Sequence, residues 1–354
     1  MTAVNMADYG LLGQLAVLAQ EQQQYQVGRV VAQEKGLYRL ISEKGEQVAE
    51  ISGRMRYNAS SASDLPAVGD FVWIGGETPD TRAVIHGVLP RKSVFIRKAA
   101  GSACREQVVA ANIDTLFLCM SLNNDFNLRR LERYLSVAWS SGAAPVVVLT
   151  KSDLCAEIDA QIRAVETVAV GTDILVTSGL AQDGYRQLLP YLQAGRTVAL
   201  IGSSGVGKST LINRLLGEER LETNGLRSDD KGRHTTTRRE LFLLRQGGMV
   251  IDTPGMRELG LWDAEEGLDR SFADVEALTG KCRFHDCSHT TEPGCAIRAA
   301  LADGTLAEIR WRSYQKLRAE SRYTEDSSDY MAQKREKFKS IAKINKLSNK
   351  RGKY

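Results

Sequence analysis

Residues 198–210 read Val-Ala-Leu-Ile-Gly-Ser-Ser-Gly-Val-Gly-Lys-Ser-Thr, and this stretch decides the fold class. An apolar run ends at Ile201, and the segment from Gly202 to Ser209 then fits the pattern G-x-x-x-x-G-K-[ST]. Apolar residues at helical spacing continue from Leu211. Strand, glycine-rich loop and helix in this order predict a phosphate-binding loop, in which backbone amides and the positive end of a helix surround phosphate oxygens.

The residue types of this loop predict individual roles. Lys208 would reach the β- and γ-phosphates of a nucleotide, and the Ser209 hydroxyl would ligate Mg²⁺. The other expected nucleotide contacts of the loop are Gly202, Ser203, Ser204, Gly205, Val206, Gly207 and Thr210.

Length and composition limit the protein class. The 354 residues suggest two or three domains, and the apolar share of 43% is ordinary for a soluble globular protein. Apolar runs of the roughly 20 residues that span a bilayer are absent from the sequence, and the N-terminus does not read as a signal peptide. We therefore expect a cytoplasmic protein without membrane contact. In that compartment its six cysteines are expected to be thiols or metal ligands.

The C-terminal tail is strongly basic. Residues 332–354 hold nine Lys and Arg side chains against one acidic residue, Glu336. Such a tail indicates a nucleic-acid-binding arm whose lysines contact phosphates, and the alternative is a solvated tail without a ligand.

The first hundred residues predict a small β-barrel. Residues 1–22 are polar and are expected to be flexible. Five short β-branched or aromatic runs then alternate with glycines, at 27–31, 37–41, 48–51, 71–74 and 83–88. This spacing favours an oligonucleotide-binding (OB) barrel. Basic and aromatic residues could bind RNA there, or could be ordinary surface groups: Arg54, Arg56, Tyr57, Trp73, Arg91, Lys92, Arg97 and Lys98.

After an expected linker at 98–110, the pattern alternates between strand and helix. Strands are predicted at 115–120, 145–149, 174–176, 197–201 and 249–251, with helices near 128–140, 155–168 and 184–193. This βα repeat predicts a parallel sheet with ligands at the carboxyl ends of its strands.

Short polar motifs stand at those strand ends. The segment Thr150-Lys151-Ser152-Asp153 resembles the guanine-specificity motif of GTPases, and Thr177-Ser178-Gly179 resembles their second guanine-contacting segment. By this resemblance the Asp153 carboxylate would accept hydrogen bonds from guanine N1–H and the 2-amino group. The Lys151 stem would lie along the base, and the Ser178 amide would meet guanine O6.

Two further segments resemble the GTPase switches. Asp252-Thr253-Pro254-Gly255 resembles switch II, where Asp252 would hold Mg²⁺ through water and the Gly255 amide would sense the γ-phosphate. The threonines after His234 resemble switch I, and either Thr235 or Thr236 would complete the Mg²⁺ shell. Many GTPases place a water-orienting glutamine after switch II, but this chain has Met256. His234 is the best remaining candidate to position water, and its alternative is an exposed loop histidine.

The motif order is permuted, because the guanine motifs precede the phosphate loop. With an OB-like domain before it and a cysteine cluster after it, the chain resembles the ribosome small subunit-dependent GTPase A (RsgA/YjeQ) family. The resemblance covers nearly the whole chain after the flexible segment at 1–22. We expect an OB-like barrel at 23–100, a circularly permuted α/β P-loop GTPase domain at 101–278, and a zinc-binding, basic helical domain at 279–354.

Residues 280–297 predict a metal site. Cys282, Cys287, His289 and Cys295 have the spacing C-x4-C-x-H-x5-C, and three thiolates with one imidazole form a closed tetrahedral set for a structural Zn²⁺. His285 competes for the imidazole position, and the family pattern favours His289. Helices near 296–303, 306–321 and 329–345 are expected to carry the basic surface.

The resemblance also implies the activity and the partner. We expect a monomeric GTPase that converts GTP to GDP and phosphate, binds the 30S ribosomal subunit and its 16S rRNA, acts in late subunit maturation and is activated by the subunit. The alternatives are an RNA-binding GTPase acting on another structured RNA, and a zinc- and RNA-binding protein whose nucleotide fold is vestigial. Intact Lys208, Ser209 and Asp252 argue against the last.

Overall fold

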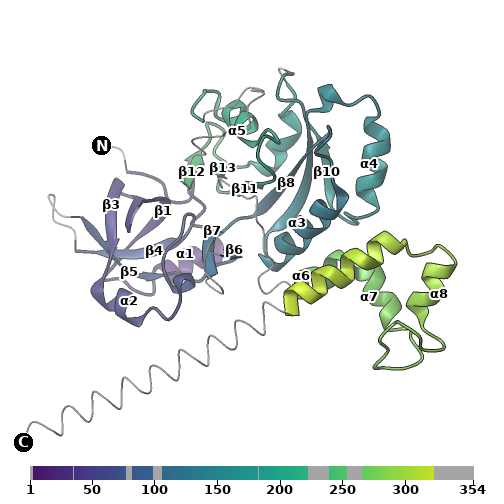
Figure 1. Ribbon diagram of the computed structural model, residues 1–354. Helices are drawn as coiled ribbons and strands as arrows, with labels where there is room; N and C mark the ends of the chain where they lie inside the picture. Colours follow the sequence, from purple (N-terminus) through teal and green to yellow (C-terminus); the bar gives the residue numbers. More distant parts are fainter. Residues whose placement is uncertain are drawn as a thin grey trace, which may run out of the picture.

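The computed structural model describes residues 3–34, 36–76, 82–98, 106–181, 183–221, 239–252 and 265–322. Within these ranges the chain forms a β-barrel, a central α/β domain and a C-terminal helical part, which Figure 1 shows from purple through teal to yellow. None of the described helices is both long and apolar enough to cross a membrane.

The N-terminal strands close into a five-stranded barrel. They are β1 (Gln26–Glu34), β2 (Leu37–Ser42), β3 (Gly45–Ile51), β4 (Phe71–Gly75) and β5 (Ala83–Val88). The order is β1-β2-β3-β5-β4, and β4 pairs again with β1; the β3–β5 pair is parallel and the others are antiparallel. Leu40, Val72, Ile74 and Ile85 are fully buried inside. The expected OB-type barrel is confirmed, with α2 (Gly53–Asn58) and the short helix η1 (Ala62–Asp64) between β3 and β4.

Residues 3–22, for which we expected little order, contact the barrel. They contain α1 (Gly13–Ala19), and the buried side chain of Met6 packs with Phe71 and Leu89. These apolar side chains are too few to indicate a packed segment until the barrel provides their partners.

The predicted linker at 98–110 is wrong in part. Strands β6 (Val94–Lys98) and β7 (Glu106–Ala111) form a separate antiparallel sheet, in which Phe95 and Ala110 are opposite each other and buried. Each strand has only a short apolar run beside charged residues, so neither one stands out in the sequence.

The central domain is built on a mostly parallel sheet. Its strands are β8 (Thr115–Ser121), β9 (Ala144–Thr150), β10 (Asp173–Val176), β11 (Thr197–Ile201), β12 (Glu240–Leu243) and β13 (Met249–Asp252). They lie in the order β10-β9-β8-β11-β13-β12, and only β12 is antiparallel to its neighbour in this set. The strand before the phosphate loop, β11, is therefore central, between a strand that precedes it in the chain and one that follows.

Helices cover this sheet on both faces, over two buried clusters. They are α3 (Leu128–Ser140), α4 (Ile158–Glu166), α5 (Lys208–Leu216) and the short helices η2 (Ser152–Leu154) and η3 (Arg186–Tyr191). The helix expected at 184–193 is only a 3₁₀ helix, and Pro190 lies inside it, where it has no amide to donate. The other expected strands and helices of this domain are confirmed.

The barrel and the central domain share one continuous sheet, because β1 pairs with β12 at Ala32 and Glu240. Arg39 of β2 forms an ion pair with the Glu240 carboxylate. The fully buried Arg29 of β1 donates to Gly69 O at 3.2 Å and to Thr197 Oγ1 at 2.9 Å. The β1–β12 pairing and the Arg39–Glu240 ion pair hold the barrel against β12, and the Arg29–Thr197 hydrogen bond links the barrel to the start of the central strand β11.

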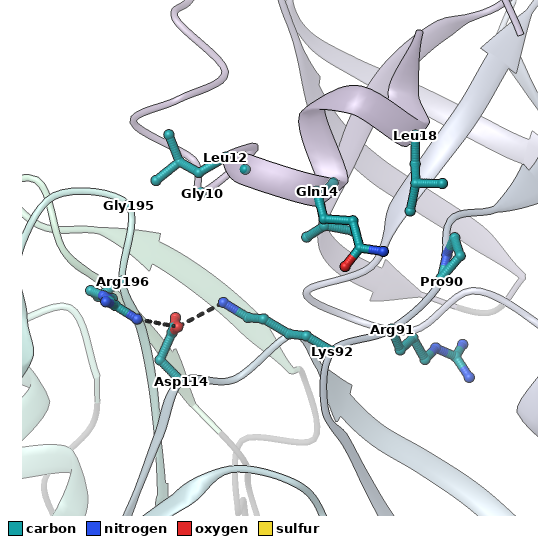
Figure 2. Close-up of a pocket in the computed structure, with 12 residues that line it drawn as sticks. Gly10, Leu12, Gln14, Leu18, Pro90, Arg91, Lys92, Asp114, Gly195 and Arg196 are labelled. Atoms are coloured by element: carbon teal, nitrogen blue, oxygen red, sulfur yellow. Dashed lines mark hydrogen bonds and ion pairs between the residues drawn. The ribbon is translucent and has the colours of Figure 1, made fainter. Parts of the chain in front are cut away.

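A second joint lies at the amino ends of the central strands. Figure 2 shows Lys92 and Arg196 on either side of Asp114, with donor–acceptor distances of 2.7 and 3.0 Å, in a cavity of about 420 Å³ beside α1. Burial alone would raise the pKa of Asp114, but the hydrogen bonds from Lys92, the Thr197 amide and Arg196 lower it. This cavity is at the opposite end of β11 from the phosphate loop.

The C-terminal part contains α6 (Glu265–Ser271), α7 (Ala273–Thr279), α8 (Ala296–Ala302) and a helix at 308–322. It docks on α3 of the central domain, where Arg133 makes two hydrogen bonds of 2.8 Å to the Glu320 carboxylate. The predicted helices near 296–303 and 306–321 are confirmed, and the one near 329–345 lies outside the described residues.

Candidate nucleotide site and Cys3His cluster

The phosphate loop runs from the end of β11 to the start of α5. Gly205 and Gly207 have φ angles of +78° and +105°, which L side chains rarely adopt. At Gly202 a Cβ atom would lie 2.5 Å from the Cys119 carbonyl oxygen, so that position also requires glycine. The tight turn exposes Ser204 and Gly205, places Ser209 and Thr210 in the first turn of α5 and buries Val206.

Lys208 folds back over its own loop. Its ammonium donates to the carbonyl oxygens of Gly202 and Ser203, both at 2.8 Å. Burial lowers the pKa of Lys208, and the nearby Cys119 and Asp252 groups oppose that effect. The loop therefore holds one positive charge on two neutral carbonyl oxygens of its own backbone.

The TKSD segment lies directly against the phosphate loop. The Thr150 hydroxyl, at the end of β9, donates to Val206 O at 2.6 Å. Lys151 has a left-handed φ of 56°, and its neighbour Ser152 begins η2. Thr150 and Val206 are far apart in the sequence, and this hydrogen bond brings the two loops together at the carboxyl ends of β9 and β11.

The TSG segment, which follows β10, lies beside the TKSD segment. The Thr177 amide donates to Leu149 O at 2.7 Å, and the Ser178 hydroxyl donates to the Asp153 carboxylate at 2.5 Å. Asp153 is exposed, whereas Thr177 and Ser178 are buried. The buried Ser178 hydroxyl therefore orients the Asp153 carboxylate, which remains accessible to solvent.

Gly184 is a residue of this site that the sequence analysis missed. A Cβ atom at this position would lie 2.1 Å from Ser178 O, and the Gly184 backbone therefore has to pass directly over the Ser178 segment. A single glycine outside a recognised motif is a weak signal, because most glycines serve turns.

We expect Gly184→Ala to weaken GTP binding about tenfold or more, because the added methyl displaces the Ser178 segment or the chain over it. Titration of a fluorescent guanine nucleotide measures this effect. Gly53→Ala is the matched control, since its Cβ would meet nothing within 4 Å. Equal affinity for the wild type and Gly184→Ala, with equal thermal stability, would contradict the role of Gly184.

Asp252 ends the strand beside the phosphate loop. Burial raises the pKa of Asp252 to about 6, Lys208 opposes the rise and Glu240 adds to it. An ionised carboxylate at this place is poorly solvated, and a nearby cation would stabilise it. The expected switch residues His234, Thr235, Thr236 and Gly255 lie outside the described residues.

The predicted metal ligands form a compact cluster. The ligand atoms of Cys282, Cys287, His289 and Cys295 all lie within 4.8 Å of one another. His289 Nδ1 is 3.5 Å from the sulfurs of Cys282 and Cys295, and these two sulfurs are 3.9 Å apart. Tetrahedral bonds of roughly 2.3 Å to sulfur and 2.0–2.1 Å to nitrogen would produce similar separations. The four side chains can hold one metal ion, and the ring in this cluster is that of His289 rather than His285.

These observations define the class of protein. The phosphate loop and two guanine-type motifs lie together at the carboxyl ends of strands of the central parallel sheet. Both guanine motifs precede the phosphate loop in the chain. The protein is a circularly permuted P-loop GTPase.

Comparisons with known proteins identify the family. The sequence model for RsgA GTPase matches residues 88–262. A small ribosomal subunit biogenesis GTPase, RsgA 2 of Lactiplantibacillus plantarum, is 49% identical over 324 residues, which cover 90% of each chain. RsgA 1 of Listeria innocua is 46% identical over 89% of this chain and 90% of its own. The chain belongs to the RsgA family of small ribosomal subunit biogenesis GTPases.

Solved structures agree with the fold. The crystal structure of YjeQ from Thermotoga maritima matches with a TM-score of 0.60 and 28% identity, over 82% of this chain and 96% of that one. The structure of YloQ, described as a circularly permuted GTPase, matches with a TM-score of 0.58 and 24% identity, over 86% and 97%. The permuted domain and the barrel that we predicted are thus those of the family.

Proposed function

We propose that this GTPase binds the 30S ribosomal subunit through its 16S rRNA, acts in late maturation of that subunit and is activated by it. The relatives are named for biogenesis of the small ribosomal subunit, which supports this partner. One observation supports guanine nucleotide binding most directly. Three loops that are far apart in the chain meet at the carboxyl ends of the strands, where the Thr150–Val206 and Ser178–Asp153 hydrogen bonds join them.

In the proposed site, the guanine base lies between Lys151 and the Ser178 segment. Asp153 accepts from N1–H and the 2-amino group, and the rear hydrogen bond from Ser178 holds its carboxylate in the required plane. Thr150, Ser152 and Thr177 keep this edge in register with the phosphate loop. Adenine does not offer the same pair of donors, so the carboxylate selects guanine.

The phosphates occupy the loop from Gly202 to Thr210. An entering triphosphate replaces the two loop carbonyls on Lys208, so the ammonium reaches the β- and γ-oxygens with little movement. The buried Asp252 carboxylate and the Ser209 hydroxyl fit an Mg²⁺ ion, and Thr235 or Thr236 would add a further ligand. When bound, Mg²⁺ neutralises charge that develops on the phosphate oxygens. His234 would orient the attacking water, and the Gly255 amide would contact the γ-phosphate.

We propose that the metal of the Cys3His cluster is a structural Zn²⁺. Four protein ligands leave no open position for substrate, so the ion holds the 282–295 loop rather than catalysing a reaction.

We also propose that the protein is a cytoplasmic monomer. The proposed domains are the segment 1–22, the barrel 23–100, the GTPase domain 101–278 and the C-terminal domain 279–354. The boundary after residue 100 falls between the paired strands β6 and β7.

GTP turnover with and without ribosomal subunits tests the partner. We expect purified small subunits to stimulate hydrolysis strongly, because partner binding orders the switches, while large subunits do not. Equally slow turnover without subunits, with small subunits and with large subunits would agree with a GTPase but contradict the ribosomal partner. Stimulation by another structured RNA alone would favour the second candidate, an RNA-binding GTPase with a different RNA.

We expect Asp153→Asn to lower GTP affinity about 100-fold and to shift preference toward xanthine nucleotides. The asparagine amide donates a hydrogen bond, which matches the xanthine 2-carbonyl and clashes with the guanine amino group. Competition of GTP and XTP against a labelled nucleotide measures the shift, and Asp159→Asn, an exposed carboxylate on α4, is the control. Unchanged GTP affinity would remove the guanine assignment.

A further inference from the structure

A carboxylate outside all the sequence motifs touches the phosphate loop. Asp125 lies in the loop between β8 and α3, and its Oδ2 atom accepts a hydrogen bond of 2.5 Å from the Ser203 hydroxyl. Ser203 is the residue whose carbonyl oxygen also accepts from Lys208. One residue of the loop is thus held at two atoms, by the phosphate-binding lysine and by Asp125.

We propose that Asp125 is a positioning residue of the nucleotide site, which keeps the phosphate loop in its nucleotide-binding shape through Ser203. This proposal rests on the nucleotide site described above. Asp125 is not assigned to contact the nucleotide, and it acts through the loop.

A carboxylate beside a phosphate site needs charge compensation, since otherwise it would repel the nucleotide. Arg130 supplies this compensation, because its guanidinium donates to the same Oδ2 atom at 2.8 Å. Burial would raise the pKa of Asp125, but the Ser203 and Arg130 hydrogen bonds and the nearby Lys151 charge lower it. The group is therefore an ionised acceptor at neutral pH whose charge is balanced by two cations.

A positioning residue has to be held in place itself. Asn123 Oδ1 accepts from the Asp125 amide at 3.0 Å and from the Ser121 hydroxyl at 2.8 Å. On the other side, Asn127 caps α3 by accepting from the Arg130 amide at 3.1 Å. Asp125 is thus fixed from the end of β8 and from the first turn of α3.

The same helix is anchored by the C-terminal part of the chain. Glu132 of α3 is 0% exposed and accepts from Arg310 at 2.9 Å and from the Ser313 hydroxyl at 2.6 Å. A buried carboxylate is costly without such partners, so α3 stays where the helix at 308–322 holds it. In Figure 1, α3 lies between the central sheet and the C-terminal helices. Docking of that helix therefore supports the Asp125 contact.

Three variants separate the hydrogen bond from the charge. Asp125→Ala removes both, Asp125→Asn keeps an oxygen acceptor for Ser203 but loses the charge, and Ser203→Ala removes only the donor. Asp159→Ala, an exposed carboxylate on α4, is the matched control. Kd values for GDP and GTP, nucleotide dissociation rates, kcat, KM and thermal stability are measured on the full chain.

For Asp125→Ala we expect GDP and GTP to bind about 5- to 30-fold more weakly, mostly through faster dissociation, with KM raised more than kcat is lowered. Asp125→Asn should recover most of the affinity. The double variant Ser203→Ala/Asp125→Ala should be no weaker than either single variant, because both remove one contact.

Wild-type affinities in Asp125→Ala would overturn the proposal, as would additive losses in the double variant. A loss of thermal stability in Asp125→Ala without the affinity recovery in Asp125→Asn would also overturn it, since it indicates a role in folding only. If the wild type itself fails to bind guanine nucleotides, the proposed function fails instead, so the two failures are distinguishable.

Discussion

Lys208→Ala is expected to lower intrinsic GTP turnover at least about 100-fold and up to about 1,000-fold. The ammonium is the cation that the phosphate loop holds in advance on the Gly202 and Ser203 carbonyls, and a preorganised charge of this kind stabilises the transition state without reorganisation. Single-turnover hydrolysis of radiolabelled GTP at saturating nucleotide measures the effect on the chemical step.

Two controls keep this result specific. Lys316→Ala removes an exposed lysine of the C-terminal helix and should leave intrinsic turnover unchanged. The melting temperature of Lys208→Ala is measured beside turnover, because Gly202 is buried and its carbonyl oxygen loses a hydrogen bond in this variant. A folded Lys208→Ala protein with wild-type turnover would show that another group supplies the charge.

Loss of the metal is expected to unfold the 282–295 loop and to release the helices that follow it. Binding free energies of structural Zn²⁺ in small zinc modules are about 10–16 kcal/mol, and this free energy is part of the folding free energy. In Cys287→Ser we expect no bound zinc and rapid proteolysis after residue 280. Metal analysis and limited proteolysis of the wild type should find one zinc per chain and a protected C-terminal part.

The control for the metal experiment is Cys155→Ser, because Cys155 lies at the start of the α4 region and outside the cluster. Nucleotide affinity provides a second readout. Because the helix at 308–322 anchors α3 through Glu132, its release in Cys287→Ser should weaken nucleotide binding, but by no more than Asp125→Ala does. One zinc per chain in Cys287→Ser would contradict the assignment of the ligands.

Much of the candidate site could be predicted from the sequence because its demands are local. The phosphate loop needs glycines at fixed positions, as the left-handed φ angles at Gly205 and Gly207 show. The four metal ligands lie within fourteen residues, so their spacing already limits their geometry. The barrel strands were equally accessible, since each is a β-branched run between turn residues.

The missed features depend on partners far away in the chain. Phe95 of β6 and Val109 of β7 are buried because they join a core cluster that also contains Val31 of the barrel. Met6 is buried because it packs against Phe71 and Leu89. The importance of Gly184 comes from the backbone of Ser178 lying against it, which no local pattern indicates.

By itself, the sequence determined the chemistry of this protein: a phosphate loop, a guanine motif, a permuted order and a set of metal ligands. Short-range backbone geometry and side-chain chemistry specify these features, so they can be recognised before folding is considered. Only the tertiary structure decided how the parts act on one another. Strand β1 pairs with β12, and Asp125 accepts a hydrogen bond from Ser203, only when segments that are distant in the chain pack together. Burial and orientation at such contacts are properties of the whole fold, and the residues that make them carry no local mark.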